Sequence, residues 1–148
     1  MARATYQDAV RVKGRLQALT GLNQPEFRNL LPYFEKAFSH RMSMYTLEGN
    51  ERQNRPFIDY ENASLSTIED KLLFVLVFIK QNLTQDVMAF LFEMSPAKVH
   101  EWLQTLIPVV KQSLRLSNDI PVKSKKELSE RLKDQEAPLF ATTVPNDL

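Results

Sequence analysis

Polar side chains with several hydrogen-bonding directions gather between Thr84 and Thr105. Lysine donates, glutamate accepts and glutamine does both, so such side chains at helical spacing can pair with the edge of a planar ligand. Acid–base or metal chemistry is not indicated, because the sequence has no cysteine and its two histidines, His40 and His100, stand in no paired-ligand spacing. We therefore expect no catalytic residue, no metal and no cofactor, and interpret His100 as a surface residue.

Three consecutive helices are expected to position these side chains. Ser66-Thr67-Ile68-Glu69 has the pattern of a capping box, with the hydroxyl of Ser66 at the N-cap. Thr84 can cap a second helix that ends at Phe92. Ser95 can cap a third, with Pro96 at the first helical position, where its missing N–H costs nothing.

The second and third helices are separated by a very short turn, which is the arrangement of a helix-turn-helix. Ala89 is a small residue where the two helices would cross, and Val99 would pack back against it. Glu93 stands at the turn position that glycine usually occupies. A left-handed backbone there would cost about 1 kcal/mol or more, which favours a turn of different geometry. A plain helical hairpin is the alternative that spacing alone leaves open.

Two stretches resemble a known family. Residues 65–110, LSTIEDKLLFVLVFIKQNLTQDVMAFLFEMSPAKVHEWLQTLIPVV, are similar to the helix-turn-helix that precedes the catalytic domain in DDE-superfamily transposases of bacterial insertion sequences. Residues 19–38, LTGLNQPEFRNLLPYFEKAF, resemble the segment upstream of it. The resemblance implies sequence-specific binding to double-stranded DNA at terminal inverted repeats, with a homodimer as a further expectation.

In such a domain the third helix enters the major groove with its N-terminal residues at base edges. With Val99, Trp102 and Leu103 toward the core, Lys98 could read guanine, Gln104 adenine and Glu101 cytosine. Residues at the start of the second helix are candidates for phosphate contacts. The predicted DNA-binding residues are Thr84, Gln85, Ser95, Ala97, Lys98, His100, Glu101, Gln104 and Thr105.

The charge balance limits how DNA could be held. The formal net charge is +1, so a DNA-binding surface must be local rather than a field over the whole molecule. A competing interpretation is a helical protein–protein interaction or dimerisation module without direct DNA contact. Steep salt dependence of binding separates the two, because only a DNA binder releases counterions.

The N-terminal region is expected to contain two helices. Residues 1–20 are compatible with one helix that ends at Gly21, and their basic side chains form either a solvated face or a phosphate-contacting arm. A second helix opens near Asn23, and Pro32 should kink or split it. The basic residues of the first helix are Arg3, Arg11, Lys13 and Arg15.

Residues 40–63 show no sustained periodicity, and either a small hairpin or a long loop fits them. Arg41, Arg52 and Arg55 could reach a phosphate backbone from this region. Residues 117–148 form a second unit, with a linker, a short helix ending at Lys133 and a partly ordered tail.

These patterns predict an all-α, compact helical domain over residues 1–116, with the helix-turn-helix at 84–107. Where the resembling transposases carry their first catalytic aspartate, this sequence has Ala141, Thr142 and Thr143, so we expect a DNA-binding portion without a catalytic domain. No signal peptide or membrane span is expected, which favours a cytoplasmic protein. The resemblance implies that it is bacterial and associated with the nucleoid. The predicted core is Phe27, Leu30, Phe34, Leu72, Leu76, Ala89, Val99, Trp102 and Leu106.

Overall fold

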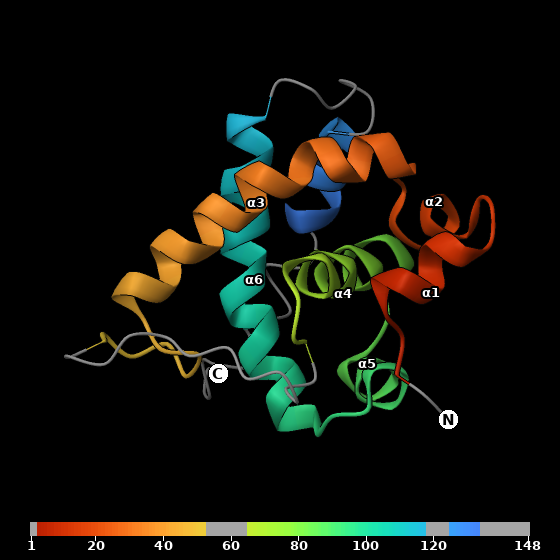
Figure 1. The fold of residues 1–148 in the computed structure, drawn as a ribbon. Coiled ribbons are helices and arrows are strands. Elements are labelled where there is room, and N and C mark those ends of the chain that lie inside the picture. Colours follow the sequence, from red (N-terminus) through yellow and green to blue (C-terminus); the bar gives the residue numbers. More distant parts are fainter. Residues whose placement is uncertain (1–2, 53–64, 118–124, 134–148) are drawn as a thin grey trace.

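The computed structural model describes residues 3–52, 65–117 and 125–133, and all of its regular elements there are helices (Figure 1). This confirms the all-α prediction. A further helical segment covers residues 125–133. The labelled helices are α1 (Tyr6–Arg11), α2 (Arg15–Thr20), α3 (Gln24–Met44), α4 (Ile68–Gln81), α5 (Gln85–Phe92) and α6 (Pro96–Leu116).

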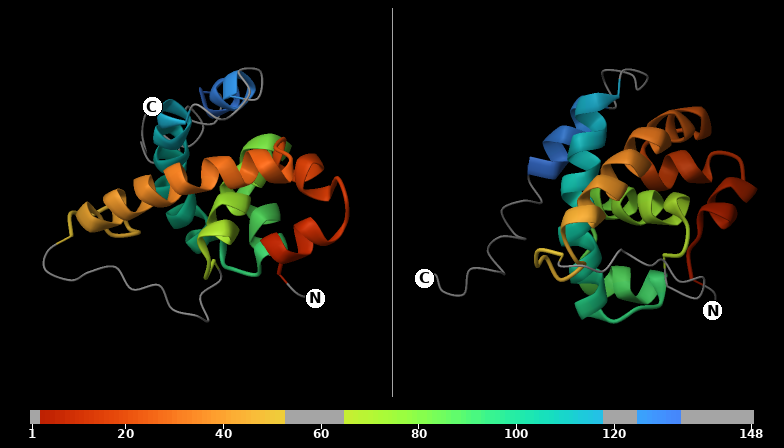
Figure 2. Two further views of the ribbon diagram at one scale, coloured as in Figure 1. Left: turned by 45° about the horizontal axis from the view of Figure 1, so that its top comes forward. Right: turned by 60° about the vertical axis from the view of Figure 1, so that its left-hand side comes forward.

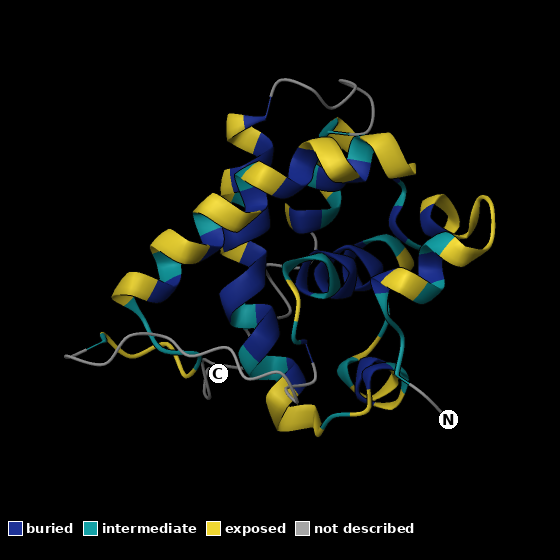
Figure 3. Ribbon diagram, viewed as in Figure 1, coloured by how far each residue is buried: buried dark blue, intermediate teal, exposed yellow. Residues whose placement is uncertain are grey.

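The two longest helices, α3 and α6, cross and pack on each other, and α4 lies beside both of them (Figures 1 and 2). Every residue of α4 from Lys71 to Ile79 is buried (Figure 3). A helix that is apolar all round has to be covered on every side. Helices α1 and α2 pack along α4, with Tyr6 of α1 bonded to Asp70 in its first turn and Ala18 of α2 bonded to Gln81 at its last residue, and α5 packs on α6.

The predicted core is confirmed, because all nine of its residues are buried in one continuous cluster. The cluster also includes Leu128 and Leu132 of the 125–133 segment. That segment therefore joins the core through these two leucines. The expected tail, with Ala141, Thr142 and Thr143, lies outside the described residues.

Two local predictions differ from the structure, and one alternative of a third is excluded. The first twenty residues do not form one helix, because Gly14 takes a left-handed conformation, with φ of 81°, between α1 and α2. The N-cap of α4 is Thr67 rather than Ser66, and its hydroxyl accepts a bond from the Asp70 N–H at 3.0 Å. Of the kink and the split expected at Pro32, the split does not occur, because α3 continues through this residue, which is exposed.

The region after α3 begins with a small turn. Tyr45 and Glu51 form an isolated antiparallel bridge, and the Thr46 N–H donates to the carbonyl of Asn50 at 2.8 Å. This fits the hairpin alternative for the start of the region. Residues 53–64, with Arg55, lie outside the described residues. Within the described part of the chain, no helix is long and apolar enough to cross a membrane.

Candidate nucleic-acid interface

The turn between α5 and α6 has the geometry of a helix-turn-helix. Glu93 adopts φ 54° and ψ 55°, and the Met94 N–H donates to the carbonyl of Ala89 at 3.1 Å. The expectation of a different turn geometry at Glu93 was therefore wrong. The packing of α5 against α6 outweighs the local cost of a left-handed glutamate.

Both helices begin at the predicted caps. The hydroxyl of Thr84 accepts from the Val87 N–H at 3.2 Å, and that of Ser95 accepts from the Lys98 N–H at 3.1 Å. Each bond satisfies one N–H that the first turn of a helix leaves unpaired. The remaining N–H groups and the positive end of the dipole of α6 make its start favourable for an anion.

Aromatic packing fixes the direction in which α6 points. Phe92 of α5 meets Phe74 of α4 edge to face, with ring centroids 4.9 Å apart. Trp102 of α6 stacks on Phe38 of α3 at 6.4 Å. Contacts of this kind bury large areas and have preferred orientations. Because the buried face of α6 is fixed by this packing, the orientation of its solvent-exposed face is fixed as well.

Most of the predicted contact residues are accessible. Thr84, Ser95, Ala97 and Lys98 are exposed. The other accessible positions are half-buried, and they are Gln85, His100, Glu101 and Gln104.

Thr105 is the exception, because it is fully buried. It lies three residues after Trp102, so helical spacing turns it toward the same interior side. Its hydroxyl oxygen is buried and has no hydrogen-bond partner among the described residues. The expectation that Thr105 faces outward was wrong, and we no longer place it among the DNA-contacting residues.

Gln104 is held by the turn that follows α3. Its side-chain Nε2 donates to the carbonyl of Leu47 at 3.2 Å, and a Cβ added at Gly49 would lie 3.4 Å from the same nitrogen. Arg41 donates to the backbone carbonyl of Gln104 at 3.5 Å. This turn, far from α6 in sequence, therefore lies against the middle of α6, a contact that periodicity could not indicate.

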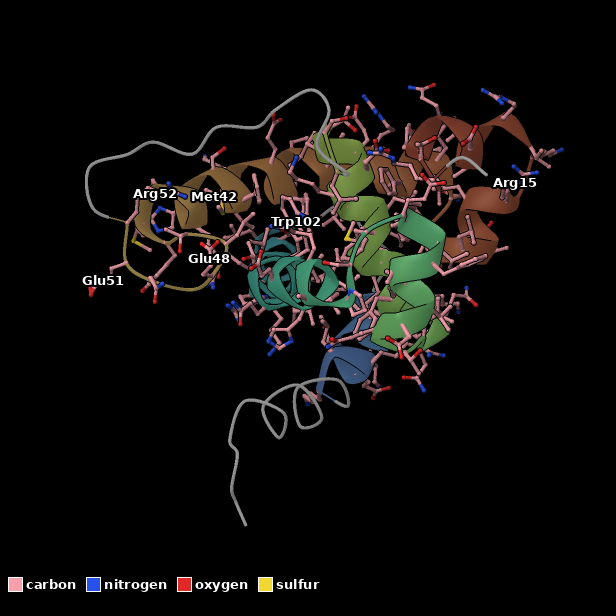
Figure 4. The ribbon with its side chains drawn as sticks, turned by 90° about the horizontal axis from the view of Figure 1, so that it is seen from below. Arg15, Met42, Glu48, Glu51, Arg52 and Trp102 are labelled. Atoms are coloured by element: carbon pink, nitrogen blue, oxygen red, sulfur yellow. The ribbon has the colours of Figure 1, made fainter. Side chains whose placement is uncertain are left out.

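The face around the start of α6 is not strongly basic. Lys98 forms an ion pair with Glu101 at 2.8 Å, and Glu93 is exposed in the turn. Glu48 and Glu51 are exposed on the turn beside α6, as the view of this end of the molecule shows (Figure 4). Carboxylates beside phosphates repel them, so this face alone gives little electrostatic attraction to DNA.

Arginines expected near phosphates make internal bonds in the structure. Arg52 donates to the carbonyls of Met42 at 2.6 Å and Tyr45 at 3.0 Å. Arg41 lies over the Tyr45 ring, 5.1 Å from its centroid. These bonds hold the turn after α3 closed.

The N-terminal segment is attached to this region. The Ala4 N–H donates to the carbonyl of Leu91 in α5 at 3.0 Å, and the Tyr6 N–H donates to the Asp70 carboxylate at 2.7 Å. Within α1 the charge of Arg11 is paired with Asp8 at 3.3 Å. The residues before α1 thus contact α5, and α1 itself begins against α4.

A buried lysine was not anticipated from the sequence. Lys71 of α4 is fully buried, and its ammonium donates to the Leu65 carbonyl at 2.7 Å. The same nitrogen lies 5.4 Å from the Phe38 ring and 5.6 Å from the Trp102 ring. A buried amino group needs such partners. Through them, Lys71 of α4 contacts Phe38 of α3 and Trp102 of α6.

Comparison with known protein families agrees with this geometry. Residues 63–116 match the family model for the helix-turn-helix of DDE superfamily endonuclease. The matched segment spans α4, α5 and α6, which confirms the resemblance drawn from the sequence and indicates DNA binding. No curated protein and no solved structure matches the chain. In the described ranges, no group of three or more His, Asp or Glu side chains could hold a metal ion.

Proposed function

We propose that the chain binds double-stranded DNA sequence-specifically, at the terminal repeats of a mobile element, as the DNA-binding portion of a transposase. The observation that carries this proposal is the capped, exposed start of α6 in a DDE-type helix-turn-helix. In such motifs the second helix of the pair reads base edges in the major groove.

Lys98 and its neighbours would read the site. Exposed ion pairs contribute little free energy, so Lys98 can exchange Glu101 for a guanine edge or a phosphate at small cost. Glu101 would then accept from cytosine or lie away from DNA. Gln104 would present its side-chain oxygen and the second N–H of its amide, because only one N–H is bonded to the Leu47 carbonyl. Ala97 and His100 are the remaining residues of the proposed DNA-contacting surface.

The experiment is a fluorescence-anisotropy titration on terminal-repeat and scrambled duplexes. Lys98→Ala should weaken specific binding by about 1–3 kcal/mol, concentrated at one base pair, if Lys98 reads a base. A uniform loss with a salt slope lower by about one unit would assign Lys98 to phosphate. Lys13→Ala, the same change at an exposed lysine in the turn between α1 and α2, is the matched control, and an equal loss there would instead indicate the phosphate-contacting arm. Equal binding of the wild type to both duplexes, with no effect of Lys98→Ala or Gln104→Ala, contradicts the proposal.

We also propose that the chain has no strand-transfer or nuclease activity of its own. The family match covers a DNA-binding segment, and the expected position of the first catalytic aspartate is occupied by alanine and threonines. Metal-dependent cleavage requires carboxylates that hold the ions. Cleavage by the purified chain with Mg²⁺ or Mn²⁺, abolished by mutating one of its carboxylates, would contradict this.

An interaction module is the second candidate. Phe90 is 66% exposed on α5, and Val87, one helical turn before it, is 41% exposed. Such an apolar pair fits a homodimer or a protein partner. Under this alternative, Phe90→Ala would abolish self-association while DNA binding by the chain would be absent at every salt concentration.

A further inference from the structure

The second half of α6 is flanked by two open depressions whose charged lining residues are all basic. The first, of about 540 Å³, lies between α3 and α6, and the basic residues in its lining are Lys36, His40, Arg41 and Arg115. The right-hand view of Figure 2 brings this side of the molecule forward.

The second depression, of about 300 Å³, lies between α6 and the 125–133 segment. Its basic lining residues are Lys111, Arg115, Lys125 and Lys133. Arg115 borders both depressions, so they form one basic surface that wraps around the end of α6. We call this the α6 basic surface.

The acceptors bound by Arg115 and Lys125 leave the charge of these two side chains in place. Arg115 donates to the side-chain oxygen of Gln112 at 2.8 Å, and Lys125 donates to the carbonyl of Ser117 at 2.6 Å. Both acceptors are neutral. No ion pair joins Lys36, Arg115 or Lys133 to a carboxylate in the ranges that the structure describes. Burial, followed by the charge of Arg115, lowers the pKa of Lys111, as expected where cations crowd together.

The surface lies far from the base-reading end of the helix. Lys98 and Arg115 are separated by seventeen residues of α6, which corresponds to about 26 Å at 1.5 Å per residue. A helix enters the major groove only over its first turns. The α6 basic surface therefore lies beyond the bases that Lys98 could touch.

We propose that the α6 basic surface binds the phosphate backbone of duplex DNA. Because the whole chain carries a net charge of only +1, the cations gathered here are balanced by carboxylates elsewhere, some of them beside the start of α6. Two depressions around one helix suit an extended polyanion better than a small anion. Non-specific affinity for DNA comes from such phosphate contacts. The inference rests on the proposed DNA binding and assigns the electrostatic part of it to a separate surface.

The test uses the whole chain and the double variant Lys36→Gln/Arg115→Gln, because both side chains are exposed. The matched control is Lys13→Gln/Arg28→Gln, which removes the same charge from two exposed positions outside the α6 basic surface. Thermal melts establish that both variants are folded. Affinity is measured against salt on terminal-repeat and scrambled duplexes of about 30 base pairs.

The α6 variant should lose affinity by the same factor on both duplexes, and its salt slope should fall by about two units. The control should keep the wild-type slope. Equal slopes for the wild type and the α6 variant, or equal losses for the α6 variant and the control, overturn the inference. The first of these results would leave an acidic protein segment as the occupant of the surface.

The outcome also separates this inference from the proposed function. If the wild type binds both duplexes equally and the α6 variant still lowers the slope, recognition by α6 fails and the basic surface stands. If the wild type discriminates and the α6 variant keeps the wild-type slope, recognition stands and the basic surface fails. Two further measurements locate the phosphate backbone that the α6 basic surface binds. If a preformed wild-type complex retains a labelled second duplex and the complex of the α6 variant does not, the surface binds a second DNA segment. If the α6 variant instead protects a shorter footprint than the wild type on a single duplex, the surface binds the duplex that α6 reads.

Discussion

The two halves of α6 face different electrostatic surroundings. Around its start, Lys98 is paired with Glu101 and exposed carboxylates stand on the neighbouring turns. Around its end, the charged residues of two depressions are all basic. Hydrogen-bonding groups with balanced charge discriminate between sequences, whereas clustered cations attract any phosphate backbone. Under the proposed DNA binding, specificity and affinity would be assigned to opposite ends of one helix.

The first test of this comparison removes the packing that holds both halves of α6 in place. Trp102→Ala should lower the free energy of unfolding by about 3–5 kcal/mol, because it removes a buried indole that stacks on Phe38. Chemical denaturation followed by circular dichroism measures this. Phe90→Ala, an aromatic truncation at an exposed position, should change stability by about 0.5 kcal/mol or less. Similar losses for the two variants would mean that Trp102 does not anchor α6.

A buried cation should behave unlike the surface cations. Lys71→Met keeps an unbranched side chain, one atom shorter, but removes the bond to the Leu65 carbonyl, so stability should fall by about 1–3 kcal/mol. The salt slope of DNA binding should stay at the wild-type value, since Lys71 is fully buried. Lys36→Met, at an exposed lysine, should show the reverse pattern. An altered salt slope for folded Lys71→Met would count against this division of roles.

The start of α6 can be tested with a substitution at Ser95 that preserves the N-cap hydrogen bond and adds a negative charge. Ser95→Ala should cost about 0.5–2 kcal/mol of stability through loss of the cap. Ser95→Asp retains a capping oxygen, so it should remain close to wild type in stability while weakening DNA binding by repulsion. The control is Thr67→Asp at the N-cap of α4. If Ser95→Asp binds DNA as well as the wild type does, the start of α6 does not face DNA.

The turn gives the smallest expected effect. Glu93→Gly should stabilise the fold by about 1 kcal/mol, because glycine adopts the left-handed conformation without steric cost. Glu93→Ala keeps the strain and should show no such gain. Glu93→Gln removes only the charge, so it should strengthen DNA binding to the same extent as Glu93→Gly. A difference in DNA binding between these two variants would show that backbone geometry, and not charge, sets affinity there.

The sequence by itself determined most of the helices, the N-caps of α5 and α6, and a central part of the core. Caps act through bonds within one turn, so Thr84 and Ser95 were predictable from residue type and spacing. The apolar residues of the predicted core repeat at helical spacing, and all of them are buried. Gly21 has the left-handed conformation expected at a helix end. These features are local, and a single segment contains the information for each.

Contacts between segments distant in sequence were decided only by the tertiary structure. Thr105 is buried and Gln104 is bound to Leu47 because α3 and its following turn pack against α6. The left-handed Glu93 persists because packing of α5 on α6 overrides a local penalty. The α6 basic surface combines side chains from α3, α6 and the 125–133 segment, so no single stretch of sequence shows its charge. Burial and electrostatic neighbourhood depend on which helices meet, and helical periodicity does not specify that.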